Sequence, residues 1–153
     1  MLTQLATVKA RLALSVTDYD DLLTRAIEAV SARFDKECNR TLARTVGATQ
    51  EFPARGTEII ARCYPIETVS KFELKTTEAG GWIEQTGVDY LIRQACTISL
   101  ILPLSFVPQA VSPQLTRVTY TGGYVMPGST PSAGQTALPA DLDRTSGGVV
   151  SAA

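Results

Sequence analysis

The chain of 153 residues contains no histidine and only three cysteines, Cys38, Cys63 and Cys96. Without histidine, the Ser-His-Asp and Cys-His arrangements that activate a nucleophile are excluded. No two cysteines have C-x-x-C spacing and no convincing set of four zinc ligands can be assembled, so we expect neither a metal nor a cofactor. An odd number of widely spaced cysteines favours reduced thiols in a cytosolic compartment.

An excess of charge and long apolar runs are also missing. The formal net charge is −1, so the sequence does not favour nucleic acid as a bulk electrostatic partner. No apolar run reaches the length of a membrane span, and the first residues lack the basic start and apolar core of a secretory signal. With 44% apolar and 19% charged residues, the chain has the composition of one soluble globular domain.

What the sequence does contain begins with two expected helices. Apolar residues recur at three- and four-residue spacing over 3–14, which predicts a short helix capped by Thr3. A second helix is expected over 18–39, capped by Thr17, with three acids in its first turn where the helix dipole favours negative charge. Its apolar positions step by three or four and predict a buried stripe: Leu23, Ile27, Val30, Phe34 and Cys38.

From Arg40 onward the pattern is that of short strands. Strands are expected over 41–52, 57–64, 69–75, 82–84, 88–93, 97–102 and 115–121, with breaks at Gly47 and Gly87. Within 69–75, Lys71, Glu73 and Lys75 share one face of the strand. The predicted fold class is therefore α+β, with an N-terminal αα-hairpin followed by an antiparallel β-sheet or small sandwich.

The end of the chain differs in composition. Residues 126–137 are small and polar without periodicity, and Leu138 to Leu142 (LPADL) is typical of a helix start. We therefore divide the chain into a body, residues 1–125, with helices within 3–39 and strands within 41–121, and a flexible connector with a C-terminal arm, residues 126–153. The arm is expected to be extended or to form a short helix, and to be frayed unless a partner orders it.

Several residues that could carry chemistry have a simpler structural interpretation. Cys38 is expected to be a small core residue, since free cysteine is commonly buried. The acids Asp18, Asp20 and Asp21 are explained by the helix dipole better than by a metal site. Aromatic residues are enriched in strands, so Trp82 and the tyrosines at 64, 90, 120 and 124 are expected to pack in the body.

Three stretches in this order resemble the phage head–tail connector, or adaptor, proteins of the HK97 gp6-like type. The first is the helical opening up to Cys38-Asn39-Arg40-Thr41. The second is the apolar strand 59–64 followed by Pro65-Ile66 and the strand from Val69. The third is 118–124 (VTYTGGY) followed by 138–142 (LPADL). The resemblance covers nearly the whole chain to Arg144. It departs from the family after LPADL, where a longer helix is usual and Gly147-Gly148 leaves little room.

The resemblance implies a virion protein that catalyses no reaction. Such proteins form a ring, usually twelve-fold, beneath the portal protein, and they bind the next neck or tail protein. Double-stranded DNA passes through the channel without sequence-specific binding. The expected location is the virion neck, after assembly in the host cytoplasm. The arm is expected to contact the portal or a neighbouring subunit through Leu138, Pro139, Asp141, Leu142 and Arg144. Independently of the resemblance, charged contacts between subunits are expected from Arg25, Arg33 and Arg40 of the αα-hairpin, which would meet acids of the next subunit.

Three alternatives stay open. The chain could be a stopper or tail-completion protein of the same neck, although an all-β fold would be expected of a stopper. It could be a small ligand-binding or carbohydrate-binding module that uses Trp82 and Tyr90. An enzyme that relies on two carboxylates, for instance Glu84 with Asp89, is the third alternative. These two acids lie on either side of the predicted turn at Gly87.

Overall fold

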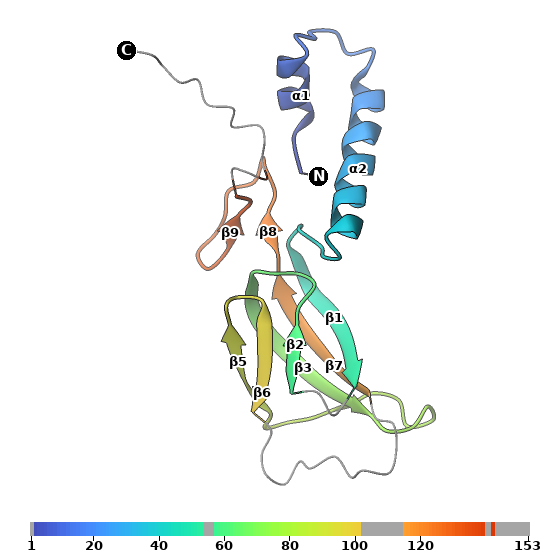
Figure 1. Cartoon of the computed structure of the whole chain (residues 1–153), viewed down its shortest axis with the longest axis vertical. Coiled ribbons are helices and arrows are strands. Elements are labelled where there is room, and N and C mark those ends of the chain that lie inside the picture. The colour runs from blue at the N-terminus through green and yellow to red at the C-terminus, as the bar shows by residue number, and fades with distance from the viewer. Residues whose placement is uncertain (1, 54–56, 102–114, 140–141, 143–153) are drawn as a thin grey trace. The chain divides into compact units, whose positions relative to one another are not determined.

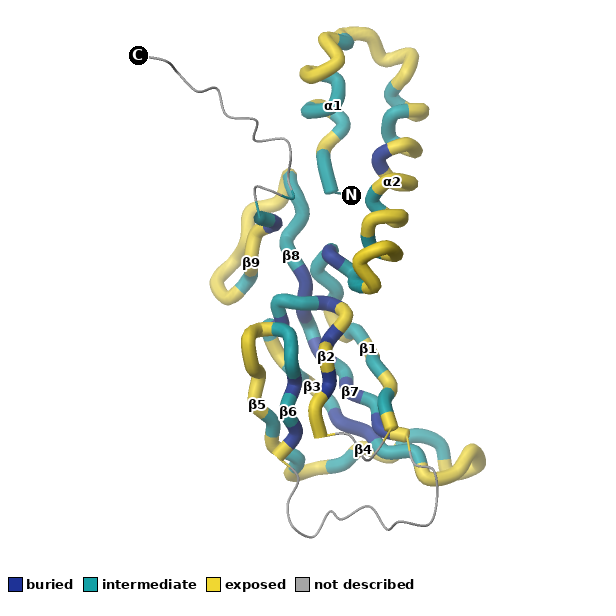
Figure 2. Tube along the Cα trace, viewed as in Figure 1, coloured by how far each residue is buried: buried dark blue, intermediate teal, exposed yellow. Residues whose placement is uncertain are grey.

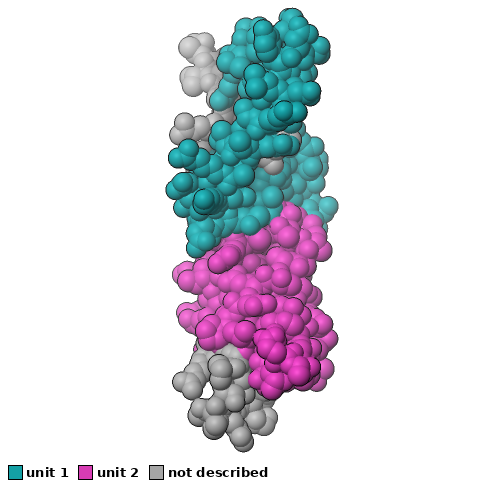
Figure 3. Space-filling model, turned by 90° about the vertical axis from the view of Figure 1, so that its right-hand side faces the viewer, with its two compact units in different colours: residues 1–43, 124–153 teal, residues 44–123 magenta. Residues whose placement is uncertain are grey.

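The described part of the chain has an α+β fold with two helices and antiparallel sheets, which confirms the predicted class (Figure 1). The computed structural model describes residues 2–53, 57–101, 115–139 and 142. The chain forms two compact units, one of residues 1–43 and 124–153 and the other of residues 44–123 (Figure 3). The boundary that the sequence predicts between residues 125 and 126 stays a prediction. The contacts within the chain define these two units instead.

In its described residues, the unit of residues 44–123 contains two antiparallel sheets. The strands of the first sheet lie in the order β1 (Thr45–Pro53), β7 (Leu115–Gly122), β3 (Ile66–Lys75) and β4 (Ile83–Glu84). Those of the second lie in the order β2 (Glu58–Ile60), β6 (Thr97–Ile101) and β5 (Asp89–Arg93). The long strand β7 therefore pairs with two strands that lie far from it in the sequence.

Both sheets contribute to one hydrophobic core (Figure 2). Strand β7 buries every second residue from Thr116 to Gly122, as the alternation of its sequence predicts. Val118 of β7 and Ile98 of β6 have no exposed surface. Among the described residues, the buried members of this core are Ile59, Ala61, Cys63, Ile66, Phe72, Ile98, Leu100, Val118 and Tyr120.

The break predicted at Gly87 (φ 77°) is confirmed, since this residue lies between β4 and β5. Gly47 (φ 68°) instead lies within β1, where the register only shifts, so the break predicted there was wrong. Strand boundaries were also wrong, since β1 starts four residues later than predicted. The strand predicted over 57–64 is only Glu58–Ile60, because the N–H of Ala61 already turns to the carbonyl of Cys96, at 2.8 Å. Strand β3 starts three residues earlier than predicted, directly after Pro65.

The other unit contains helices α1 (Leu5–Arg11) and α2 (Asp20–Glu37). Both start two residues later than predicted. Gln4 and Tyr19 are the N-cap residues and neither makes a side-chain cap, so the predicted caps at Thr3 and Thr17 were wrong. The carbonyl of Thr17 instead accepts a hydrogen bond from the N–H of Asp20 at 3.0 Å, which places a turn before α2.

The same unit includes two short parallel strands, β8 (Tyr124–Val125) and β9 (Thr136–Ala137). The N–H of Tyr124 donates to the carbonyl of Leu42 at 2.7 Å, which ties β8 to the segment after α2. The helix predicted from Leu138 depends largely on residues 140–141 and 143–153, which lie outside the described residues. None of the helices in the described part of the chain is long and apolar enough to cross a membrane.

Candidate functional site

Helix α2 has an apolar side that the rest of its unit covers only in part. Of the predicted stripe, Ile27 is buried, but Val30 is 66% exposed and Phe34 37% exposed. Cys38, predicted to be a core residue, is exposed. The reason is the length of α1. Its seven residues extend roughly 10 Å, whereas the eighteen residues of α2 extend roughly 27 Å, so α1 covers less than half of α2.

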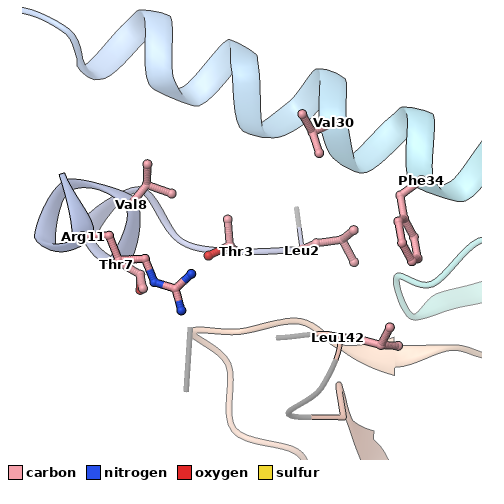
Figure 4. Close-up of a pocket in the computed structure, with 8 residues that line it drawn as sticks. All are labelled: Leu2, Thr3, Thr7, Val8, Arg11, Val30, Phe34 and Leu142. Atoms are coloured by element: carbon pink, nitrogen blue, oxygen red, sulfur yellow. The ribbon is translucent and has the colours of Figure 1, made fainter. Parts of the chain in front are cut away.

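An open groove of about 370 Å³ lies between α2 and the first residues of the chain (Figure 4). Leu2, Phe34 and Leu142 gather at one end of the groove, and Thr7 and Arg11 lie at the other. The remaining residues that line it are Thr3, Val8 and Val30. Arg11 is the charged member of a set that is otherwise apolar or neutral, so the groove suits an apolar occupant better than a polar ligand.

Two polar interactions hold the N-terminal segment against α2. The N–H of Leu2 donates to the hydroxyl of Ser31 at 3.0 Å. Lys9 of α1 forms an ion pair with Asp20 in the first turn of α2, with 2.6 Å between Nζ and Oδ1. The acid at position 20 therefore acts in helix pairing and lies in the first turn of α2, as predicted.

The arginines predicted to contact a neighbouring subunit lie in different environments. Arg25 is exposed on α2. The side chain of Arg33 is 83% exposed and lies 3.9 Å from Glu37, one turn further along the helix. The guanidinium of Arg40 lies over the ring of Tyr124, 5.5 Å from its centroid, so Arg40 packs within its own unit.

The residues predicted in the C-terminal arm also differ from one another. Leu138 is buried, and its N–H donates to the carbonyl of Val125 at 3.1 Å. Pro139 is half-buried, and Leu142 lines the groove beside α2. Asp141 and Arg144 lie outside the described residues.

A buried charge cluster in the sheet unit is the second candidate site. Glu73 is only 4% exposed. Burial raises its pKa, but hydrogen bonds from Lys71 and Arg117 outweigh this and hold the pKa of Glu73 below its ordinary value. Arg117 Nε lies 2.7 Å and Lys71 Nζ 2.9 Å from the carboxylate. Arg117 also stacks on Trp82 at 4.4 Å. The carboxylate is thus fully paired, which indicates a structural role.

The sequence placed Glu73 beside the lysines but did not reveal Arg117. The two residues lie opposite each other in the pairing of β3 with β7, 44 residues apart in the chain. The sequence indicated only that Arg117 lies in a strand, between residues that the structure buries. The pairing of the two strands could not be predicted from local patterns.

The residues of the two open chemical alternatives are not assembled into one site. Tyr90 lines a hollow of about 100 Å³ between the sheets, but Trp82 is not among its lining residues. Glu84 lies 3.5 Å from Lys71, whereas the Asp89 carboxylate accepts the N–H of Tyr90. Within the described ranges, no three side chains of the metal-binding types come together.

No family model matches the chain, and no similar curated protein or solved structure was found.

Proposed function

We propose that this chain is a structural head–tail connector, or adaptor, of a tailed-phage virion. In this proposal, copies of the chain form a ring, twelve-fold if it matches the portal, between the DNA-filled capsid and the neck. The ring contacts the portal protein on one side and the next neck or tail protein on the other. Double-stranded DNA passes through its channel, and the protein catalyses no reaction.

The observation that carries the proposal is the exposed apolar side of α2. Large apolar residues such as Val30, at 66% exposure, lie beside a groove of about 370 Å³. Apolar surfaces of this kind commonly mark sites of protein association. When one side of a helix contacts a different surface of the next subunit, the same contact can be repeated from subunit to subunit. The subunits form a ring if the rotation that relates neighbours adds up to a full turn. The proposal assigns that role to the αα-hairpin.

Charged residues next to this side support a contact between subunits. Arg25 and Arg33 are exposed on α2 and are available to acids of a neighbour. Arg40 already packs on Tyr124, and we therefore assign it a supporting position within the subunit. In the arm, Leu138 is buried in its own chain, so a portal contact would use the residues after it.

Mixing the purified chain with a portal ring tests the proposal. Negative-stain microscopy and light scattering should detect a ring of the chain bound to the portal. Variant Val30→Asp should weaken this assembly, whereas Ala32→Asp, an exposed change elsewhere on α2, should not. A chain that never binds the portal, together with virion necks that lack it, would contradict the connector function.

A further inference from the structure

One flank of α2 is exposed along most of the helix and is complementary to itself. We propose that this flank (Tyr19, Leu22, Ala26, Val30 and Arg33, called the α2 flank) pairs with the α2 flank of a second copy of the chain. The two helices run antiparallel about a two-fold axis at Ala26. The pairing itself needs only the geometry of α2, and only its place before ring assembly rests on the proposed connector function.

The members of the α2 flank lie on one side of the helix and face solvent. Their spacing of three or four residues places them in a row along α2 and its N-cap. Tyr19 is 52%, Leu22 67% and Val30 66% exposed. Ala26 and Val30 also line the hollows between α2 and the N-terminal segment, so the flank continues the apolar surface of the groove.

The sequence of the flank is symmetric about Ala26. Leu22 and Val30 lie four positions before and after it, and Tyr19 and Arg33 lie seven positions before and after it. In an antiparallel pair, Leu22 of each copy therefore meets Val30 of the other. The small side chain of Ala26 at the axis allows the two helices to approach closely. An antiparallel pair also places each Arg33 on the Tyr19 ring of the other copy, a favourable cation–π arrangement.

Charge decides between the two possible directions of such a pair. The first turn of α2 carries Asp20 and Asp21, whereas Arg33 and Lys36 lie toward its end. Asp20 is already paired with Lys9 of its own chain, and Asp21 lies away from the row of the α2 flank, so the charge that decides the direction is Arg33. Antiparallel helices place each Arg33 on the Tyr19 ring of the other copy, whereas parallel helices in register would place Arg33 against Arg33, which is unfavourable. Glu37 remains the intrahelical neighbour of Arg33 in either case.

The pair and the proposed ring would use the same side of α2, so one excludes the other. The antiparallel pair is therefore the form of the chain before assembly, in which the exposed apolar residues are covered. The pair would also keep a chain with this exposed apolar surface in solution until the portal, as a template for the ring, competes for α2.

Sedimentation at increasing protein concentration tests self-association. We expect a monomer–dimer equilibrium that Leu22→Asp weakens by roughly tenfold or more, since a charge would be buried against Val30. The matched control Ala32→Asp places the same charge on an exposed position of α2 outside the flank and should leave the equilibrium unchanged. The double variant Leu22→Asp/Val30→Lys should restore dimerisation, because antiparallel pairing sets each new carboxylate against a new ammonium.

A chain that remains monomeric at all concentrations would overturn the inference, as would a double variant that dimerises no better than Leu22→Asp alone. Spin labels on the exposed Cys38 supply an independent measurement of direction. A Cys96→Ser background leaves Cys63, which is buried, as the other cysteine. Antiparallel pairing at Ala26 places the two labels about 36 Å apart along the axis, at 1.5 Å per residue. A separation of roughly 10 Å would indicate parallel helices and contradict the inference.

Discussion

The sheet unit and the helix unit differ in how many of their apolar residues they bury. Nine of the twelve buried hydrophobic residues in the described part of the chain form one core between the two sheets. The helix unit buries Ile27, Leu42 and Leu138 and leaves Leu22 and Val30 about two-thirds exposed. The sheet unit thus has an extensive core of its own, although Val46 and Ile60 are also exposed, whereas the helix unit buries few apolar residues and leaves a row of them exposed on α2. Stability and assembly should therefore depend on different residues.

The largest loss of stability is expected from the core of the sheet unit. Ile98→Ala removes most of a side chain that has no exposed surface, and should lower the free energy of unfolding by about 2–5 kcal/mol. Ile60→Ala is the matched control, since Ile60 is 71% exposed in the neighbouring strand β2 and should change stability by less than about 0.5 kcal/mol. Urea unfolding measures both. Equal losses would contradict the assigned core.

A smaller loss is expected from the hydroxyl group of Tyr120. It accepts the N–H groups of Arg62 and Cys63, each at 3.1 Å, and donates to Gln50 at 3.3 Å. Tyr120→Phe leaves the buried N–H of Cys63 without this acceptor, and should cost about 1–3 kcal/mol in urea unfolding.

Tyr90→Phe is the control for this variant, because the Tyr90 hydroxyl donates a single hydrogen bond, to the carbonyl of Val69 at 3.1 Å. Its loss should cost about 0.5–1.5 kcal/mol. If the two tyrosine variants were equally stable, the Tyr120 network would not be a main stabilising feature of the sheet unit.

The ion pairs of Glu73 should make the stability of the sheet unit depend on pH. The pKa of Glu73 is lower in the folded chain than in the unfolded chain. Its contribution is therefore present above the unfolded pKa, about 4.3, and is lost as the pH falls through the lower folded value. Arg117→Met should cost about 1–3 kcal/mol at neutral pH and flatten the dependence below about pH 4.

The exposed pair of Arg93 with Glu58 is the control for the buried cluster. Both side chains are more than half exposed, so Arg93→Met should cost less than about 1 kcal/mol and leave the acid branch of the stability curve unchanged. An unchanged acid branch in Arg117→Met would show that Glu73 does not control this pH range.

The smallest change in stability is expected on α2. Val30→Ser should alter the free energy of unfolding by no more than about 0.5 kcal/mol, because Val30 is 66% exposed. The same variant should reduce assembly of the ring on a portal, since the lost apolar surface belongs to the proposed contact between subunits. Ala32→Ser is its control. A large loss of stability in Val30→Ser would instead mean that Val30 belongs to a closed core.

The sequence predicted the class of fold because its local signals were strong. Gly87 marked a real break, and the strand expected over 115–121 agrees with β7. Helix periodicity also found the apolar side of α2. It could not reveal that α1 is too short to cover that side, so Val30 and Cys38 were wrongly placed in a core. The partner of Glu73 depended on strand pairing, which local patterns do not encode.

Hydrogen exchange of the backbone amides, with and without assembly, tests the contrast between the two units most directly. Amides of β3 and β7 should exchange slowly at every protein concentration, because their core is complete. Amides of α2 should become more protected as concentration rises, and also when a portal ring is added, because these conditions supply a partner for the helix. Protection of α2 that is high in the isolated monomer and unchanged by either condition would contradict the claim that α2 is an assembly surface.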